Sequence, residues 1–122
     1  MKKREIYVLD EPLIEENFKV NAKSVKSLFS EVKDNVDDYA YEGSVTDIGF
    51  GWLYEVEECY GGGEGDGETY WIVFSLTNGA SKTYWQVDGY YASYDGGYLD
   101  GDPFQVVKKE VMKEIWVDIK KK

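Results

Sequence analysis

Histidine is absent from this 122-residue chain, and cysteine occurs once, at Cys59. Without histidine the chain lacks the usual base that activates a serine or cysteine nucleophile, so Ser/His and Cys/His mechanisms are excluded. One cysteine cannot close a disulfide within the chain, and the basic start MKKREIYVLD has no apolar signal-like stretch behind it. No apolar run is long enough to cross a bilayer. These absences predict a soluble protein of the cytoplasm.

Proline is also scarce, with two residues, while aromatic residues make up 16% of the chain, including 11 Tyr and 4 Trp. A disordered segment would have few aromatic residues and more proline. The length is that of one ordinary domain, which can bury a core without metal or disulfide support. The composition therefore predicts one β-rich domain over residues 1–122.

Basic residues are nearly missing from the middle of the chain. Residues 34–107 contain 15 acidic residues and one lysine, a net charge of −14 within a total of −10. A negative field of this kind repels nucleic acid and anionic membranes, and attracts basic proteins or divalent cations. We expect no direct binding of nucleic acid or membrane.

The strongest structural signal is a pair of runs at 69–77 and 82–91, rich in Tyr, Trp, Val, Ile and Phe. The Asn78-Gly79 step between them is typical of a β-hairpin turn. Both faces of the first run are largely apolar, which predicts a strand inside a sheet. This hairpin is the expected centre of the fold.

Two further strands are expected around it. Residues 47–58 alternate, with Ile48, Phe50, Trp52, Tyr54 and Val56 on one face. Residues 111–119 also alternate, although the apolar spacing over 106–119 leaves a helix open as the alternative.

The N-terminal third predicts two short strands, at 4–9 and 17–20, followed by an amphipathic helix. The helix should run from an N-cap at Asn21 to about Asp38, because apolar residues recur every three or four positions. Together these elements predict an α+β fold, an antiparallel meander of about four strands with the helix packed on one face.

The residues offer little chemistry. A pair of carboxylates for glycoside hydrolysis stays formally open at Glu55, Glu57 or Asp95. Asp95, Asp100 and Asp102 lie in one turn-rich loop that suits a calcium ion, without the spacing of an EF-hand. Asp and Gly are also ordinary turn residues. We expect no enzymatic activity, no cofactor and no resident metal.

The acidic surface is the better candidate for function. Its carboxylates could take the place of the phosphates of a nucleic acid in the basic groove of a nuclease, and exposed Tyr would add amphipathic contacts. The simpler alternative is a solvated face that keeps the protein soluble. The candidate residues for binding a partner are Asp34, Asp37, Asp38, Glu42, Asp47, Glu55, Glu57, Glu64, Asp66, Glu68, Tyr91, Tyr94 and Tyr98.

The segment YWQVDGYYASYDGGYLDGD, residues 84–102, resembles a pattern in small acidic proteins encoded by bacteriophages and prophages. The likeness covers residues 47–119 and brings no catalytic residues. It implies a phage product in the cytoplasm of a host bacterium, by analogy with inhibitors of host defence such as anti-CRISPR and anti-restriction proteins.

Charge and resemblance together predict an inhibitor that binds a basic host protein, such as a CRISPR or restriction effector, in part as a nucleic-acid mimic. The alternative is a β-rich module that binds Ca²⁺ or carbohydrate through the 94–102 loop.

Overall fold

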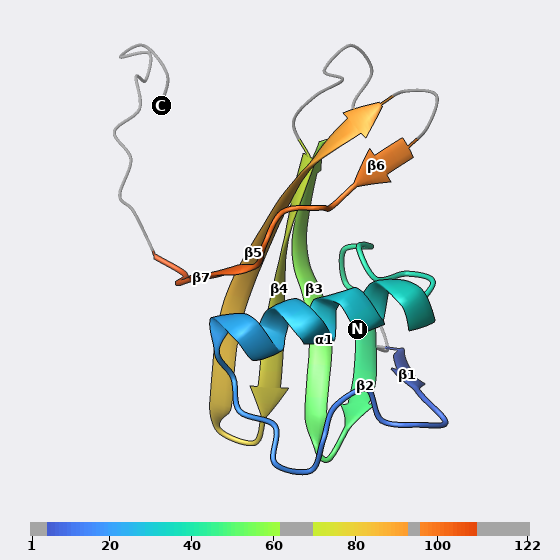
Figure 1. Ribbon diagram of the computed structural model, residues 1–122, viewed down its shortest axis with the longest axis vertical. Coiled ribbons are helices and arrows are strands. Elements are labelled where there is room, and N and C mark those ends of the chain that lie inside the picture. Colours follow the sequence, from blue (N-terminus) through green and yellow to red (C-terminus); the bar gives the residue numbers. More distant parts are fainter. Residues whose placement is uncertain (1–4, 62–69, 93–95, 110–122) are drawn as a thin grey trace, which may run out of the picture.

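The protein is an α+β structure in which one helix crosses one face of a mostly antiparallel sheet (Figure 1). The computed structural model describes residues 5–61, 70–92 and 96–109. The elements, in chain order, are β1 (Ile6–Val8), α1 (Ala22–Asn35), β2 (Val45–Gly49), β3 (Trp52–Gly61), β4 (Tyr70–Asn78), β5 (Ser81–Ala92), β6 (Gly96–Tyr98) and β7 (Phe104–Val106). The strand order is β1-β2-β3-β4-β5-β6, and β7 also pairs with β5. Only β1 and β2 run parallel among these pairs.

The helix forms where the apolar spacing predicts it. Asn21 caps it by accepting from the backbone N–H of Ser24 at 2.9 Å, and the Ser24 side chain accepts in return from Asn21. The buried face consists of Val25, Leu28, Phe29 and Val32. The helix ends at Asn35, three residues before the predicted end, because Val36 is extended, with φ −126° and ψ 118°.

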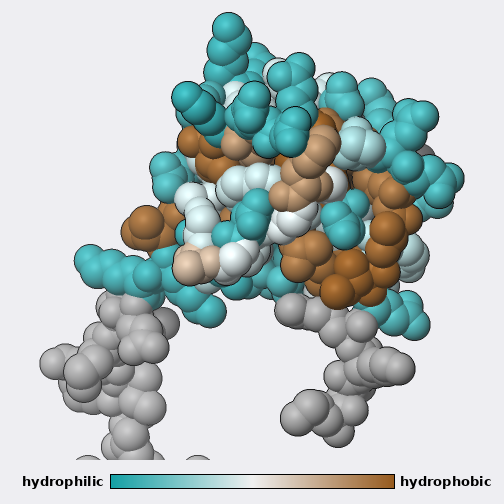
Figure 2. Space-filling view, turned by 90° about the horizontal axis from the view of Figure 1, so that it is seen from below, coloured by the Kyte–Doolittle hydropathy of each residue, from teal (hydrophilic) through white to brown (hydrophobic). Residues whose placement is uncertain are grey.

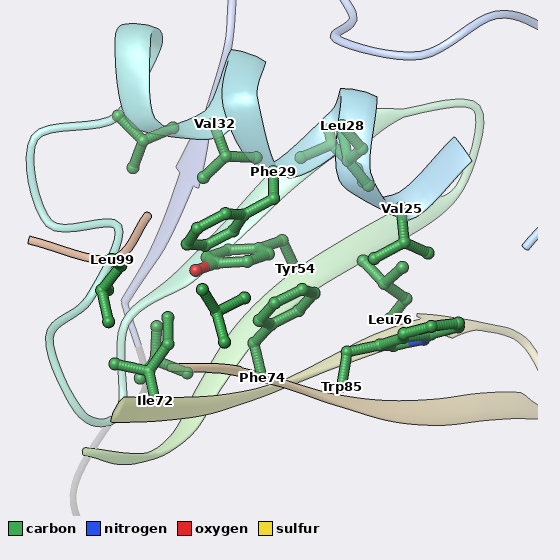
Figure 3. Packing of buried hydrophobic residues seen from close by; sticks show 14 of the residues in the cluster. Val25, Leu28, Phe29, Val32, Tyr54, Ile72, Phe74, Leu76, Trp85 and Leu99 are labelled. Carbon is green, nitrogen blue, oxygen red and sulfur yellow. The ribbon is translucent and has the colours of Figure 1, made fainter. Parts of the chain in front are cut away.

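The core lies between α1 and the sheet (Figure 3). Phe29 of the helix stacks on Phe74 of β4, with ring centroids 5.3 Å apart, and Phe74 also contacts Tyr54 of β3 at 4.9 Å. Ile72, Phe74 and Leu76 are fully buried on this side of β4. The residues that alternate with them, Trp71, Val73 and Ser75, therefore point to the opposite face, as the pleat requires.

The predicted central hairpin is confirmed. Strands β4 and β5 pair in register from Asn78↔Ser81 to Tyr70↔Gly89, and Gly79 takes a positive φ of 59° in the turn. Strand β4 lies between β3 and β5, inside the sheet.

The prediction of one strand over 47–58 is wrong, because the chain reverses in the middle of it. Gly49, Phe50 and Gly51 have positive φ values of 108°, 53° and 83°, which form a tight turn between β2 and β3. Glycine tolerates this conformation, and the Phe50 carbonyl accepts a hydrogen bond from Asn78 at 3.2 Å. Ile48 and Tyr54 are buried as predicted, whereas Phe50 is 50% exposed at the turn.

Of the two short strands predicted near the N-terminus, the structure contains the first and not the second. The 4–9 run contains β1, but β1 pairs with β2 in parallel. Residues 17–20 form no strand. Phe18 packs there edge-on against Trp52, with ring centroids 5.5 Å apart, so this segment covers one end of the core as a loop.

Two short strands lie in the described residues that follow β5, where the sequence predicts a Gly/Asp loop. Strand β6 pairs with the last residues of β5 and β7 pairs with its middle. Between β6 and β7 the chain passes over Gly89 of β5, with Leu99 buried in the core and Gly101 N–H bonded to the Asp88 carbonyl at 2.9 Å. The predicted strand at 111–119 lies outside the described residues. Its helical alternative over 106–119 lies mostly outside them.

Candidate functional site

The face of the sheet away from α1 is covered by no helix among the described residues, and we call it the open face (Figure 1). Register fixes which side chains lie on it, because directly paired residues share a face. One row crosses Glu55, Ser75 and Tyr84, and the next crosses Glu58, Val73 and Gln86. The side chains that alternation and pairing assign to the open face on β3, β4 and β5 are Leu53, Glu55, Glu57, Glu58, Tyr60, Trp71, Val73, Ser75, Thr77, Lys82, Tyr84, Gln86 and Asp88.

A β-bulge in β3 concentrates acid on this face. The pairing passes from Val56↔Phe74 directly to Glu58↔Val73, so Glu57 is the extra residue. In a regular strand Glu57 and Glu58 would point to opposite faces. Here Glu58 shares the face of Val73, and the Glu57 carboxylate accepts a hydrogen bond from Ser75 Oγ at 3.0 Å. Two consecutive carboxylates therefore lie on the open face.

Aromatic rings flank these carboxylates. Tyr60 stacks on Trp71 across the β3–β4 pair, with centroids 5.5 Å apart and planes 11° apart, and Tyr60 is 50% exposed. Tyr90 and Tyr98 form a second stack at 5.9 Å where β5 meets β6. Such half-exposed rings offer large contact area at low entropic cost.

Apolar residues are exposed at the end of the sheet that holds the β2–β3 and β4–β5 turns, and on β1. Figure 2 views the molecule from this end and shows apolar residues exposed in several places between hydrophilic ones. Phe50 in the β2–β3 turn, and Ile6 and Val8 of β1, are exposed by 50%, 48% and 75%. Pairing places Ile6 in the row of Val45 and Glu55, and Val8 beside Asp47, so the exposed apolar residues of β1 form the β1 edge of the open face.

The structure brings together only part of the predicted binding set. Glu55 and Glu57 lie on the open face, and Asp47 reaches it from β2, where its carboxylate accepts from Gly49 N–H at 3.0 Å. Tyr98 lies at the β5–β6 edge. Four predicted residues lie outside the described part of the chain: Glu64, Asp66, Glu68 and Tyr94. The side chain of Tyr91 also lies outside it.

The acids around the end of the helix form a separate group. Asp34 lies on the outer side of α1 beside Ser30 and Glu31. Asp37, Asp38 and Glu42 follow in the connection to β2, where Asp38 lies 3.5 Å from the Tyr7 hydroxyl. The described acids of the predicted set therefore lie in two groups, one on the open face and one at the end of α1. Sequence reasoning also missed Glu58, Tyr60, Trp71, Tyr84 and Asp88 of the open face.

The one cysteine, Cys59, lies on β3 and pairs with Ile72 of β4. Burial raises the pKa of the Cys59 thiol, the Glu42 carboxylate adds to this rise, and a hydrogen bond with Tyr70 opposes it. A raised pKa keeps the thiol protonated at neutral pH and lowers its reactivity.

The alternative calcium site does not assemble within the described residues, which contain no group of three acidic or other metal-ligating side chains. Asp102 instead pairs with Lys26 of α1 at 3.1 Å. Asp100 is exposed, and Asp95 lies outside the described part of the chain.

No helix in the described part of the chain is long and apolar enough to cross a membrane. Comparison with protein-family models, with curated proteins and with solved structures finds no match.

Proposed function

We propose that this protein inhibits a basic, nucleic-acid-binding protein by occupying its groove with the open face. The observation that carries the proposal is the bulge at Glu57, which puts two consecutive carboxylates beside the Tyr60–Trp71 stack. A groove built to hold phosphates presents Lys and Arg, which favour closely spaced negative charges. The neighbouring rings add contact area that a purely electrostatic surface lacks.

Charge supports the same partner. The chain carries a net charge of −10, and the described acids of the open face include Glu58 and Asp88, both exposed. Opposite charges steer the two proteins together and raise the association rate, an effect that salt screens. This face repels nucleic acid, which supports a basic protein as the partner.

The resemblance to phage-encoded proteins supports a biological setting. We propose a phage-type, non-enzymatic inhibitor of a host defence effector, a CRISPR or restriction nuclease, acting in the bacterial cytoplasm. Its stoichiometric binding would need no catalytic group, no cofactor and no metal.

The experiment is displacement of nucleic acid. A fluorescent DNA duplex is bound to each of a panel of purified CRISPR and restriction nucleases, and the protein is then titrated in. We expect displacement from at least one nuclease at about 50 mM salt, weakening at about 300 mM salt. If no member of the panel releases its duplex at low salt, nucleic-acid mimicry is rejected.

Catalysis by the inhibitor is tested in the same assay. Binding without turnover predicts that release of the duplex saturates near one protein per nuclease. Release by trace amounts of protein, with time-dependent loss of the nuclease, would mean that the protein acts as an enzyme.

A further inference from the structure

A groove runs across the open face beside the bulge, with a volume of about 440 Å³. Its carboxylates are Glu57 and Glu58 of β3, and its floor includes Val73 of β4 and Gln86 of β5. Trp71 and Tyr84 line it as aromatic walls, and residues 106–108 close the side next to β7. The volume falls within the range of sites that hold a ligand or a large side chain.

The carboxylate of Glu57 is held in place. Its hydrogen-bond donor, Ser75 Oγ, belongs to a fully buried residue of the central strand, so the donor has little freedom to move. A carboxylate fixed in this way loses little entropy when it accepts a cation. Glu58 follows it directly in the chain and is exposed at the groove.

The aromatic walls are suited to a flat cation. The Trp71 ring is backed by Tyr60 at 5.5 Å, which limits its movement. Tyr84 already accepts a cation on its ring, since Lys82 Nζ lies 5.3 Å from the ring centroid. Trp and Tyr rings attract cations through their negative faces, and a guanidinium can in addition stack on them.

We propose that this groove binds an arginine side chain of the partner protein, with the guanidinium donating to Glu57 and Glu58 and stacking against Trp71. This inference rests on the proposed function and names the chemistry that the partner must offer. Arginine suits the groove better than lysine, because a planar fork of donors matches a carboxylate in two places and an ammonium does not. Lys108 at the rim carries the same charge as the ligand and opposes it.

The test compares two peptides of equal charge, five arginines and five lysines, each labelled with the same dye. Fluorescence anisotropy measures the dissociation constant of each peptide with the full chain. We expect the arginine peptide to bind about tenfold more tightly than the lysine peptide. In Glu57→Gln and Trp71→Leu that ratio should fall toward one, and in Lys108→Gln binding of the arginine peptide should strengthen.

Glu31→Gln is the matched control, since it removes one charge from the exposed side of α1 and should leave the ratio unchanged. Thermal melting checks that each variant is folded, and Glu57→Gln keeps the volume of the side chain if Trp71→Leu is unstable. Equal binding of both peptides by the wild type, or an unchanged ratio in Glu57→Gln, overturns the arginine site.

The two failures can be told apart. If both peptides bind equally but displacement of the duplex persists, the groove is not selective and the proposed function stands. If the arginine peptide is preferred but no duplex is displaced, the groove binds arginine and the proposed inhibition is rejected. A site for free arginine is shown instead if N-acetyl-arginine amide binds as tightly as the peptide, and that result also overturns docking of a protein.

Discussion

The hydroxyl of Ser75 and the carboxylate of Glu57 are joined by a hydrogen bond of 3.0 Å across the β3–β4 pair. Ser75 is fully buried on β4, between the buried apolar residues Phe74 and Leu76. The bond satisfies a buried hydroxyl and fixes the acid that the bulge brings to the open face. This hydrogen bond therefore holds the Glu57 carboxylate on the open face at the point where the β3–β4 register shifts.

Ser75→Ala tests this contact. Loss of the donor should weaken binding of the arginine peptide by about twofold to fivefold, because the Glu57 carboxylate becomes free to turn into solvent, and should change stability by about 1 kcal/mol. Anisotropy gives the first value and urea denaturation the second. Thr77→Ala, on the same strand and face, is the control; an equal loss of binding in that variant would show that the hydroxyl of Ser75 has no special role.

Thr46 offers a gain in stability. Its side chain is fully buried on β2, and its hydroxyl has no hydrogen-bond partner within the described structure. Thr46→Val keeps the shape and removes the unsatisfied group, so the free energy of unfolding should rise by about 1 kcal/mol. Chemical denaturation measures the change, and a fall in stability would mean that the hydroxyl is bonded in the folded protein.

The close approach of β5 and β6 predicts a sensitive glycine. A Cβ on Gly89 would lie 1.7 Å from the carbonyl oxygen of Tyr98, so Gly89→Ala must push the two strands apart. We expect a loss of more than about 2 kcal/mol in the free energy of unfolding. Gly79→Ala is the control, because no atom lies within 4 Å of its Cβ and only the positive φ of 59° costs energy, about 1 kcal/mol. Similar losses in both variants would contradict the close approach.

Tyr54 predicts a pH dependence at the alkaline end. Burial raises its pKa well above the ordinary value of 10.0, and Tyr39 and Tyr70 add to the rise. A group whose pKa is higher in the folded state contributes stability that is complete below the unfolded pKa and is lost as the pH rises toward the folded one. Stability should therefore fall as the pH rises above about 10. Tyr54→Phe should flatten this fall in denaturation curves measured at several pH values, and an unchanged slope would contradict it.

Local patterns predict most of the fold. The stripe from Val25 to Val32 and the cap at Asn21 specify the helix, and Asn78-Gly79 specifies the central hairpin, because each depends on neighbours in the chain. The turn at Phe50 was missed since the apolar alternation continues through it, so the two glycines that reverse the chain read as ordinary strand positions.

The candidate site was less predictable, for a physical reason. Which face a carboxylate occupies depends on register, and a one-residue bulge reverses it. The bulge at Glu57 depends on pairing with β4, which no local pattern contains. Alternation on β4 itself would have indicated that Trp71 and Ser75 lie on the face opposite to the core, because Ile72 and Phe74 between them are strongly apolar.

The most direct measurement compares two variants with the same net charge. Glu57→Gln/Glu58→Gln/Asp88→Asn removes three charges from the open face, and Glu15→Gln/Glu31→Gln/Asp34→Asn removes three from exposed positions on the other side of the molecule, on α1 and before it. Each is titrated against a nuclease from which the wild type displaces DNA. The open-face variant should lose at least about tenfold in displacement and the other variant less than about twofold. Equal losses in the two variants would show that total charge, and not the open face, is responsible.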